Sequence, residues 1–193
     1  SNPYHGLRKA GTVGIPLPGI KIRIVNEEGR KVEEGQIGTI ELKGENIFKG
    51  YWGMKEKTKE SFKDDGFFIT GDLAMKDENG YYTIVGRDKD MIISGGLNVY
   101  PKEIEDVINQ IPDISESAVI GIIHDDFGEA VVALVISDNK KLEECYVLDQ
   151  LKDKIAKYKQ PKKIIFLEEL PRNSMGKVQK NILREKYSYL FKG

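Results

Sequence analysis

The sequence is poor in the side chains that many catalytic and metal sites use. It contains one cysteine, Cys145, and two histidines, His5 and His124, among 193 residues. A single cysteine excludes an intramolecular disulfide, and two histidines in unrelated segments argue against a histidine-based triad or a multi-histidine metal site. Nothing cationic in the sequence adjoins Cys145 to favour its thiolate, so an ordinary thiol is favoured over a nucleophile. We therefore expect a reducing, cytoplasmic compartment.

Long hydrophobic runs and an excess of charge of one sign are also absent. No apolar segment approaches 18 residues, so the sequence predicts no membrane span. The opening residues, SNPYHGLRKAG, lack the apolar core of a signal peptide. They read as a loop, and we expect the chain to be part of a longer one. Thirty basic residues against 31 acidic ones give a net charge of -1, which provides no general case for nucleic-acid binding.

The first half is rich in glycine and in short strands. The segment IKIRIV (20–25) alternates between apolar and basic residues, and further strands are predicted at 36–44 and 80–86. One or two helical turns are expected at 55–62. Short strands separated by turn residues predict a small antiparallel sheet or a piece of a barrel.

The second half has the pattern of an α+β module. The segment 101–111 places a proline in a first helical turn and apolar residues at i, i+3, i+4 and i+7, which predicts an amphipathic helix. Two apolar, β-branched strands follow, then a second helix (142–158), a third strand (162–170) and a last helix through NILREKYSYL. The fold class is therefore α+β. We place the domain boundary at the charged segment GRDKD, giving domains 1–86 and 87–193.

Asp72 is the first candidate site residue, in the segment DDGFFITGDLA (64–74) after an aromatic and apolar strand. An ionised carboxylate has two accepting oxygens, which suits the two adjacent hydroxyls of a ribose. The alternative is that TGD is a turn in which Asp72 caps backbone N–H groups. On spacing alone the turn is favoured.

Arg87 and the pair Gly95-Gly96 are the next candidates. The planar donor fork of Arg87 suits phosphate or ribose oxygens, and the alternative is a surface salt bridge with Asp88 or Asp90. Two glycines between an apolar strand and a helix permit positive φ or a close ligand approach, whereas most such pairs are ordinary turns. No dinucleotide fingerprint or P-loop spacing is present.

Lys177 is the last candidate, in the polar loop PRNSMGKVQK between a proline and a flexible glycine. A positioned cation there could stabilise the charge that develops on a phosphate or carboxylate in a transition state. Arg172 and Lys180 could flank it. Since lysine is abundant in this chain, the alternative is a solvated surface loop.

Three segments in this order, FFITGD, GRDKDMIISGGLNVYPKEIE and PRNSMGKVQK, resemble the closing motifs of the adenylate-forming acyl-CoA synthetase superfamily. Further segments such as GTVGIPLPGIKIRIV and GENIFKGYW also resemble that family, so the resemblance covers essentially the whole chain. The details of SNPYHG, DDGFFITGD and LPRNSMGKVQKN are most similar to the malonyl-CoA synthetase branch.

The resemblance implies a two-step reaction in which a carboxylic acid and ATP give an acyl-adenylate and pyrophosphate, and CoA then displaces AMP. It implies that Asp72 binds the ribose hydroxyls, Arg87 contacts ribose or phosphate oxygens, and Lys177 stabilises the adenylation transition state. The resemblance places Lys89 at a hinge and Gly95 and Gly96 along the pantetheine channel of CoA. The family's C-terminal domain turns between the two steps, which explains the use of a lysine on a loop.

The resemblance also sets what this chain is expected to lack. Mg²⁺ accompanies ATP in the family, and its ligands are expected outside this chain, in the missing N-terminal part of the same enzyme. That part would also supply the pocket for the small carboxylic acid, so residues 1–193 alone are expected to be inactive. The alternatives are a ligase of another branch, acting on medium-chain or coumarate-like acids, and a non-catalytic module that binds a nucleotide or CoA.

Overall fold

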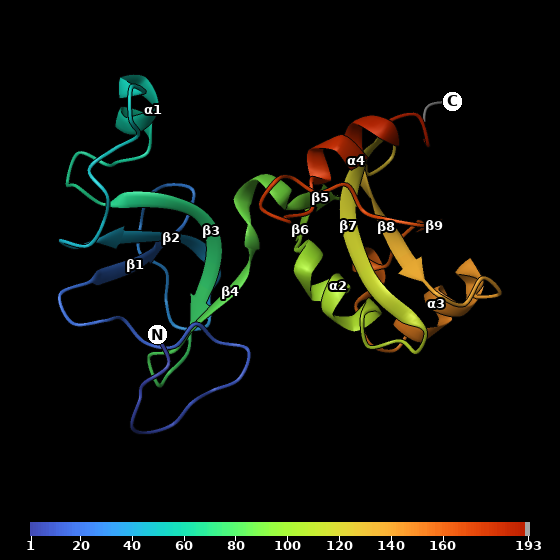
Figure 1. The fold of residues 1–193 in the computed structure, drawn as a ribbon, viewed down its shortest axis with the longest axis horizontal. Coiled ribbons are helices and arrows are strands. Elements are labelled where there is room, and N and C mark those ends of the chain that lie inside the picture. The colour runs from blue at the N-terminus through green and yellow to red at the C-terminus, as the bar shows by residue number, and fades with distance from the viewer. Residues whose placement is uncertain (192–193) are drawn as a thin grey trace. The chain divides into compact units, whose positions relative to one another are not determined.

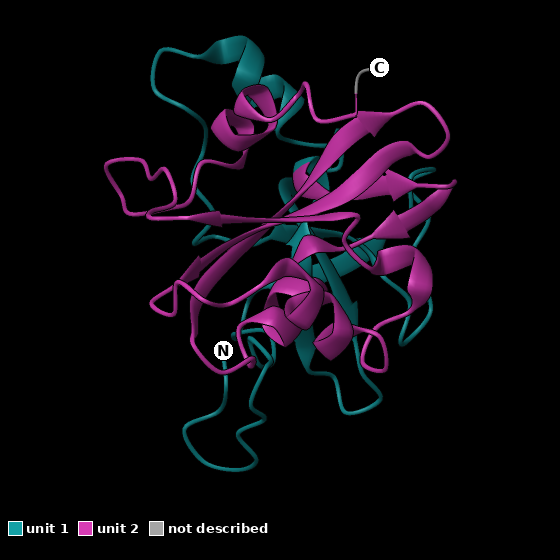
Figure 2. Cartoon of the chain, turned by 90° about the vertical axis from the view of Figure 1, so that its right-hand side faces the viewer, with its two compact units in different colours: residues 1–89 teal, residues 90–193 magenta. Residues whose placement is uncertain are grey.

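The computed structural model describes residues 1–191, and the chain divides into two compact units, Ser1–Lys89 and Asp90–Gly193. Figure 2 shows unit 1 in teal and unit 2 in magenta. The division follows Lys89, a few residues beyond the boundary expected after residue 86. Each unit has its own sheet and its own core, so the two are treated separately below.

Unit 1 is built on an antiparallel sheet of four strands in the order β1-β2-β3-β4 (Figure 1). The strands are β1 (Lys21–Val25), β2 (Gly38–Lys43), β3 (Phe68–Lys76) and β4 (Tyr82–Arg87). A short helix, α1 (Lys55–Glu60), follows β2. Buried side chains of this sheet, among them Ile24, Ile40 and Tyr82, pack together in a small core. Over the residues that the structure describes, the sheet is open, so the predicted barrel piece is a plain antiparallel sheet.

Unit 2 contains a sheet of five strands. Its long strands, β7 (Ile114–His124) and β8 (Gly128–Ser137), form an antiparallel hairpin, and β9 (Lys163–Leu167) pairs with β8 in parallel. A second hairpin, β5 (Ile92–Ser94) and β6 (Leu97–Val99), joins the sheet where β5 meets the start of β8. The α+β class predicted from the sequence is confirmed.

Helices cover both faces of this second sheet. The helices α2 (Pro101–Ile108) and α3 (Glu144–Leu151) pack in one core, and α4 (Lys180–Lys186) packs in the other. Consecutive residues of β7 alternate between the two, with Val119 in the first core and Ile120 in the second. Because both faces are buried, the strands can be apolar at nearly every position, as the sequence shows.

Two predicted elements differ from the structure. The helix expected over 142–158 is too long, because the regular helix ends at Leu151 and tight turns follow. The side-chain amide of Gln160 donates to the carbonyls of Lys152 and Ile155, at 3.2 and 3.3 Å, and so satisfies groups that a continuing helix would use. The second difference is β6, a strand where the sequence analysis expected the chain to pass directly into a helix. No helix among the described residues is long and apolar enough to cross a membrane.

Candidate functional site

Asp72 and Arg87 lie directly opposite each other on neighbouring strands of unit 1. Asp72 is inside β3, Arg87 is the last residue of β4, and the antiparallel register pairs the two residues. Arg87 Nε lies 2.7 Å from Asp72 Oδ1, and the side chains are 49% and 27% exposed, respectively. The sheet thus brings together two of the residues selected from sequence, at a surface that solvent or a ligand can reach.

An irregular stretch of β3 sets the direction of Asp72. Gly71 has a φ of 72°, which a glycine adopts without strain, and the β3–β4 register shifts between Leu73 and Ala74. The Thr70 hydroxyl donates to the Ile40 carbonyl at 2.8 Å and accepts the Asp72 N–H at 3.0 Å. Bulges of this kind re-aim side chains and are common beside active sites. Sequence reasoning missed Thr70, and the Thr-Gly-Asp triplet was the available signal.

The geometry corrects two sequence interpretations. Asp72 is not in a turn but within a strand, and the backbone N–H beside it is satisfied by Thr70. Arg87 pairs with Asp72, whereas Asp90 pairs with Arg184. Because Arg87 uses Nε for this contact, its two terminal nitrogens keep the planar fork that suits phosphate or ribose oxygens. Asp72 Oδ2 has no hydrogen-bond donor within residues 1–191, so the carboxylate retains capacity to accept hydroxyl groups.

Gly95 and Gly96 form the two-residue turn of the β5–β6 hairpin in unit 2. Ser94 pairs with Leu97, and the glycines have φ values of 59° and 78°. A turn with positive φ at both central positions matches the twist of a hairpin and favours glycine. The Gly95 N–H donates to the Phe127 carbonyl at 2.8 Å, which fixes the tip to the β7–β8 turn. A Cβ at either glycine would meet nothing within 4 Å, so unit 2 itself requires their backbone freedom rather than their small size.

Lys177 lies at the end of a tight loop that its own backbone and one side chain shape. The Asn173 Oδ1 accepts the N–H groups of Met175 and Lys177, both at 3.0 Å, and the Asn173 N–H donates to the Lys177 carbonyl. Gly176 takes the left-handed conformation, with φ of 76°. Asn173 was missed by sequence reasoning, although an asparagine three residues before a glycine is typical of such side-chain-capped turns. The loop therefore has a defined shape although it is exposed.

The Lys177 side chain is exposed, and its ammonium group has no ion-pair partner in the described part of the chain. The two cations expected to flank it have other contacts. Arg172 donates to the Gly176 carbonyl at 2.7 Å and pairs with Glu116 on β7, which anchors the base of the loop. Lys180 pairs with Glu105 on α2 at 2.6 Å and is mostly buried. Of the three cations in this region, Lys177 alone points its charge to solvent without a carboxylate beside it.

The predicted residues fall into separate groups. Asp72 and Arg87 are paired in unit 1, Lys89 lies in the short turn η1 (Asp88–Asp90) where unit 1 ends, and the glycine turn and Lys177 belong to unit 2. Among residues 1–191, no cluster of three or more His, Cys, Asp or Glu side chains could hold a metal ion.

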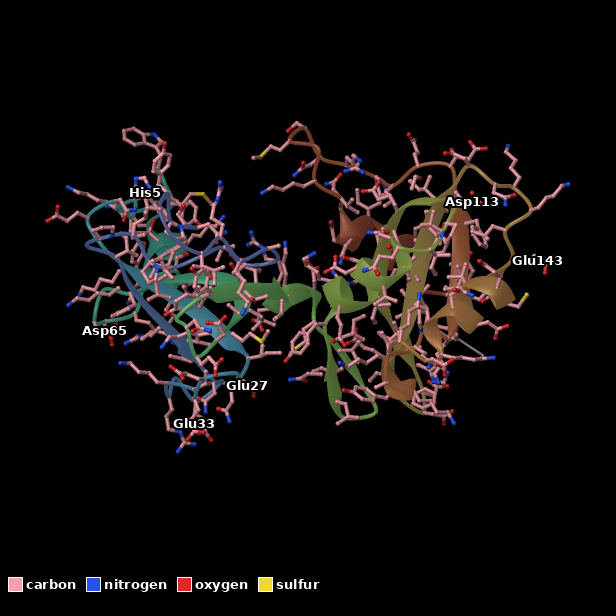
Figure 3. All side chains as sticks on the ribbon, turned by 90° about the horizontal axis from the view of Figure 1, so that it is seen from below. His5, Glu27, Glu33, Asp65, Asp113 and Glu143 are labelled. Atoms are coloured by element: carbon pink, nitrogen blue, oxygen red, sulfur yellow. The ribbon has the colours of Figure 1, made fainter. Side chains whose placement is uncertain are left out.

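A hollow of about 320 Å³ in unit 2 lies apart from these residues. It is lined by the loops that carry Asp113 and Glu143, both labelled in Figure 3, and by none of the residues selected from sequence. The Asp113 carboxylate accepts a hydrogen bond from the Asn139 side chain at 2.9 Å, so these two polar groups of its lining are already paired with each other.

Comparison with protein families gives two matches along the chain. Residues 2–52 match the family described as AMP-binding enzyme, and residues 103–177 match the AMP-binding enzyme C-terminal domain. The second match covers most of unit 2 and ends at Lys177.

Individual relatives match almost the whole chain but only part of their own length. An indoleacetate–CoA ligase of Aromatoleum aromaticum is 42% identical over 95% of this chain and 36% of its own. A malonate–CoA ligase of Arabidopsis thaliana is also 42% identical, over 96% of this chain and 32% of its own. The crystal structure of ATP-bound MatB from Rhodopseudomonas palustris is 55% identical, with a TM-score of 0.93 over 99% of this chain and 38% of that one. The chain spans about a third of the length of the curated relatives that it matches.

Proposed function

We propose, on the premise that this chain belongs to the family of AMP-binding enzymes, that it is the C-terminal part of an AMP-forming acyl-CoA synthetase. In this reaction an acid and ATP give an acyl-adenylate and pyrophosphate, and the thiol of CoA then displaces AMP to give a thioester. The observation that carries the proposal is the extent of the match. Two CoA ligases are 42% identical to this chain over at least 95% of it.

The proposal assigns the nucleotide to the Asp72–Arg87 pair of unit 1. The Asp72 carboxylate accepts the ribose hydroxyls, because an ionised carboxylate only accepts and has two oxygens. Arg87 holds that carboxylate through Nε at 2.7 Å and offers its terminal nitrogens to ribose or phosphate oxygens. The pair therefore orients the nucleotide while each member limits the rotation of the other.

Lys177 is assigned to the charge that develops during adenylation. Its exposed ammonium group stabilises negative charge on the acid and α-phosphate oxygens, where a positioned cation contributes most. Lys89 is the proposed hinge, about which unit 2, the main part of the proposed lid domain 87–193, turns after the first step while Arg87 stays paired with Asp72. The glycine turn of the β5–β6 hairpin then lines the channel for the pantetheine arm of CoA. Residues 1–86 would form the C-terminal end of the large adenylation domain.

Mg²⁺ would accompany ATP in the first step and neutralise phosphate charge. We propose that its ligands and the pocket for the acid lie in parts of the enzyme outside this chain. The described residues give the ion no ligand cluster of their own. A cytoplasmic location is part of the proposal, since the one cysteine of this chain, Cys145, is a free thiol.

Malonate, or methylmalonate, is the proposed acid. Malonate is named for the Arabidopsis relative, and the segments SNPYHG, DDGFFITGD and LPRNSMGKVQKN resemble the malonyl-CoA synthetase branch. A second candidate is an aromatic acid, because the indoleacetate–CoA ligase is as similar to this chain as the malonate enzyme is.

The test is an acid panel with the full-length enzyme, ATP, Mg²⁺ and CoA, in which AMP and acyl-CoA are both quantified. We expect malonate or methylmalonate to give the highest kcat/KM, and an aryl or medium-chain acid in first place would select the other branch. AMP without any acyl-CoA, or no turnover with any acid, would contradict the synthetase assignment and favour a binding module. Residues 1–193 alone should give no acid-dependent exchange between ATP and pyrophosphate.

A further inference from the structure

Helix α4 connects the Lys177 loop to the rest of unit 2. It begins at Lys180, three residues after Lys177, and the Gln179 N–H that precedes it donates to the Pro171 carbonyl at the other end of the loop. The helix has seven residues, and Leu183 is the only one among them that is buried. So short a helix is marginal by itself, so contacts to neighbouring elements must fix its position.

Two ion pairs on one face of α4 supply such contacts. Lys180 and Arg184 are four residues apart, which places them one above the other on the helix surface. Lys180 Nζ lies 2.6 Å from Glu105 Oε1 on α2, and Glu105 also accepts the Val119 N–H of β7 at 2.8 Å. Arg184 lies 2.6 Å from Asp90 Oδ1. The first pair therefore ties α4 to the body of unit 2, and the second ties it to the first residue of that unit.

The Asp90–Arg184 pair is more enclosed than an ordinary surface pair. The side chains of Arg184 and Asp90 are 29% and 18% exposed, whereas the surface pair Lys102–Asp106 on α2 is more than half exposed. A partly buried charge that loses its partner is costly, so both groups have reason to stay together. Asp90 follows Lys89, the proposed hinge, without an intervening residue.

We propose that the Asp90–Arg184 ion pair is a positioning contact that fixes α4, and with it the Lys177 loop, to the point where the chain enters unit 2. When unit 2 rotates about Lys89, the contacts through Asp90, Arg184 and the short helix then keep the Lys177 loop in a fixed position within that unit. This inference rests on the proposed function, because it takes unit 2 to turn about Lys89 between two steps. Neither Asp90 nor Arg184 touches substrate in this account.

The test compares variants of the full-length enzyme in the adenylation step. The rate of ATP–pyrophosphate exchange measures that step. Asp90→Asn keeps the shape of the side chain and removes its charge. We expect it to lower the rate of exchange about tenfold with KM for ATP unchanged, because small misplacements of a catalytic group reduce rate rather than binding. The double variant Asp90→Arg, Arg184→Asp should recover most of the rate, since the pair is restored with its charges exchanged.

Glu103→Gln is the matched control. It removes the Lys159–Glu103 pair, which joins α2 to η2 (Lys157–Lys159) at 2.7 Å and is also partly buried, but involves no residue of α4. Its exchange rate should equal that of the unmodified enzyme. An unchanged rate in Asp90→Asn, or an equal loss in Glu103→Gln, would overturn the positioning role.

Hydrogen exchange separates this inference from the proposed function. The amide protons of residues 182–186 should exchange at least several-fold faster in Asp90→Asn than in Glu103→Gln, whatever reaction the enzyme performs. Equal protection in the two variants would overturn the inference. An unmodified enzyme that forms no adenylate, combined with the expected exchange difference, would reject the synthetase assignment and leave the structural link standing.

Discussion

The candidate residues of the two units are held in opposite ways. In unit 1, Asp72 and Arg87 are fixed by the register of two paired strands and by contact with each other. In unit 2, Lys177 is exposed on a loop whose backbone is ordered by Asn173 while the ammonium group itself has no carboxylate partner among residues 1–191. Under the proposed function, the pair that would hold the nucleotide is already ordered by the sheet. The cation that would act in only one of the two steps lies on a defined loop and has no ion pair among the described residues.

The largest expected effect comes from removing the ammonium group of Lys177, which has no ion pair among the described residues. In the full-length enzyme, Lys177→Ala should lower acyl-adenylate formation by about 10²- to 10³-fold, the usual loss when one group that stabilises transition-state charge is removed. Thioester formation from supplied acyl-adenylate should be spared, and stability should not change because the side chain is exposed. Both half-reactions are followed separately. Lys154→Ala, at another exposed lysine of unit 2, is the control, and an equal loss of both half-reactions would contradict the assignment of Lys177.

A smaller effect is expected when the Asp72–Arg87 ion pair is broken. Asp72→Asn should raise KM for ATP about 10- to 100-fold, because a hydrogen bond to a charged group contributes about 1.5–3 kcal/mol. The stability of the enzyme should fall by less than about 1 kcal/mol, since the pair is partly exposed. Steady-state kinetics and thermal unfolding measure the two quantities.

Asp65→Asn is the control for that experiment. Asp65, labelled in Figure 3, pairs with Arg23 in the same unit and is more exposed than Asp72. Its KM for ATP should remain that of the unmodified enzyme. If Asp72→Asn also leaves this KM unchanged, the pair is structural and the nucleotide lies elsewhere.

Substitutions at Gly96 test whether the glycine turn of unit 2 has a fixed conformation that matters for CoA. Gly96→Ala should destabilise unit 2 by about 1–2 kcal/mol, because its φ of 78° is unfavourable for a residue with a Cβ. Gly96→Asn should lose less, since asparagine tolerates this conformation. A denaturant titration that resolves the unfolding of unit 2 gives both values. Should thioester formation fall further in Gly96→Asn than in Gly96→Ala, side-chain size at the turn matters for CoA; equal activities would argue against a channel there.

The smallest effect concerns an ion pair that belongs to the scaffold alone. Burial raises the pKa of Glu144, but the hydrogen bonds from Lys163 and from the Ile164 N–H together lower it by more. The net result is a pKa below its ordinary value. A lowered pKa gives stability that is present above the pKa of the unfolded chain and disappears as the pH falls through the folded one. Glu144→Gln should therefore be less stable than the unmodified protein by less than about 1 kcal/mol at pH 7, with the difference disappearing as the pH falls through the lowered pKa of Glu144.

Unfolding of the two proteins across this pH range checks the expectation. Glu168→Gln, at an exposed acid with no ion pair among the described residues, should show no such pH-dependent difference. A Glu144→Gln difference that stayed constant as the pH was lowered until the carboxyl groups are protonated would assign the effect to packing instead of charge.

The sequence predicts best where the structure follows local periodicity. Helix α2 was predicted because its apolar residues recur at helical spacing, and Ile104 and Ile108 are indeed fully buried. The hairpin strand β6 was missed because three residues, two of them exposed, carry too little pattern. The end of α3 was misplaced because the apolar spacing continues past Leu151, whereas the Gln160 side chain binds the carbonyls of the turns that follow the helix. In the site, residue types could be read directly, but the partner of Arg87 depends on strand register, which no short motif encodes.

The parallel strand β9 has a consequence for the order of folding. Strands β7 and β8 are joined by a short turn and can pair locally, whereas β9 reaches β8 only after the chain has passed through α3. Closing such a long connection is slow compared with forming a hairpin. We expect the β7–β8 ribbon to assemble first and β9 to pair later, so that during synthesis this edge of β8 stays unpaired until residues 163–167 have emerged.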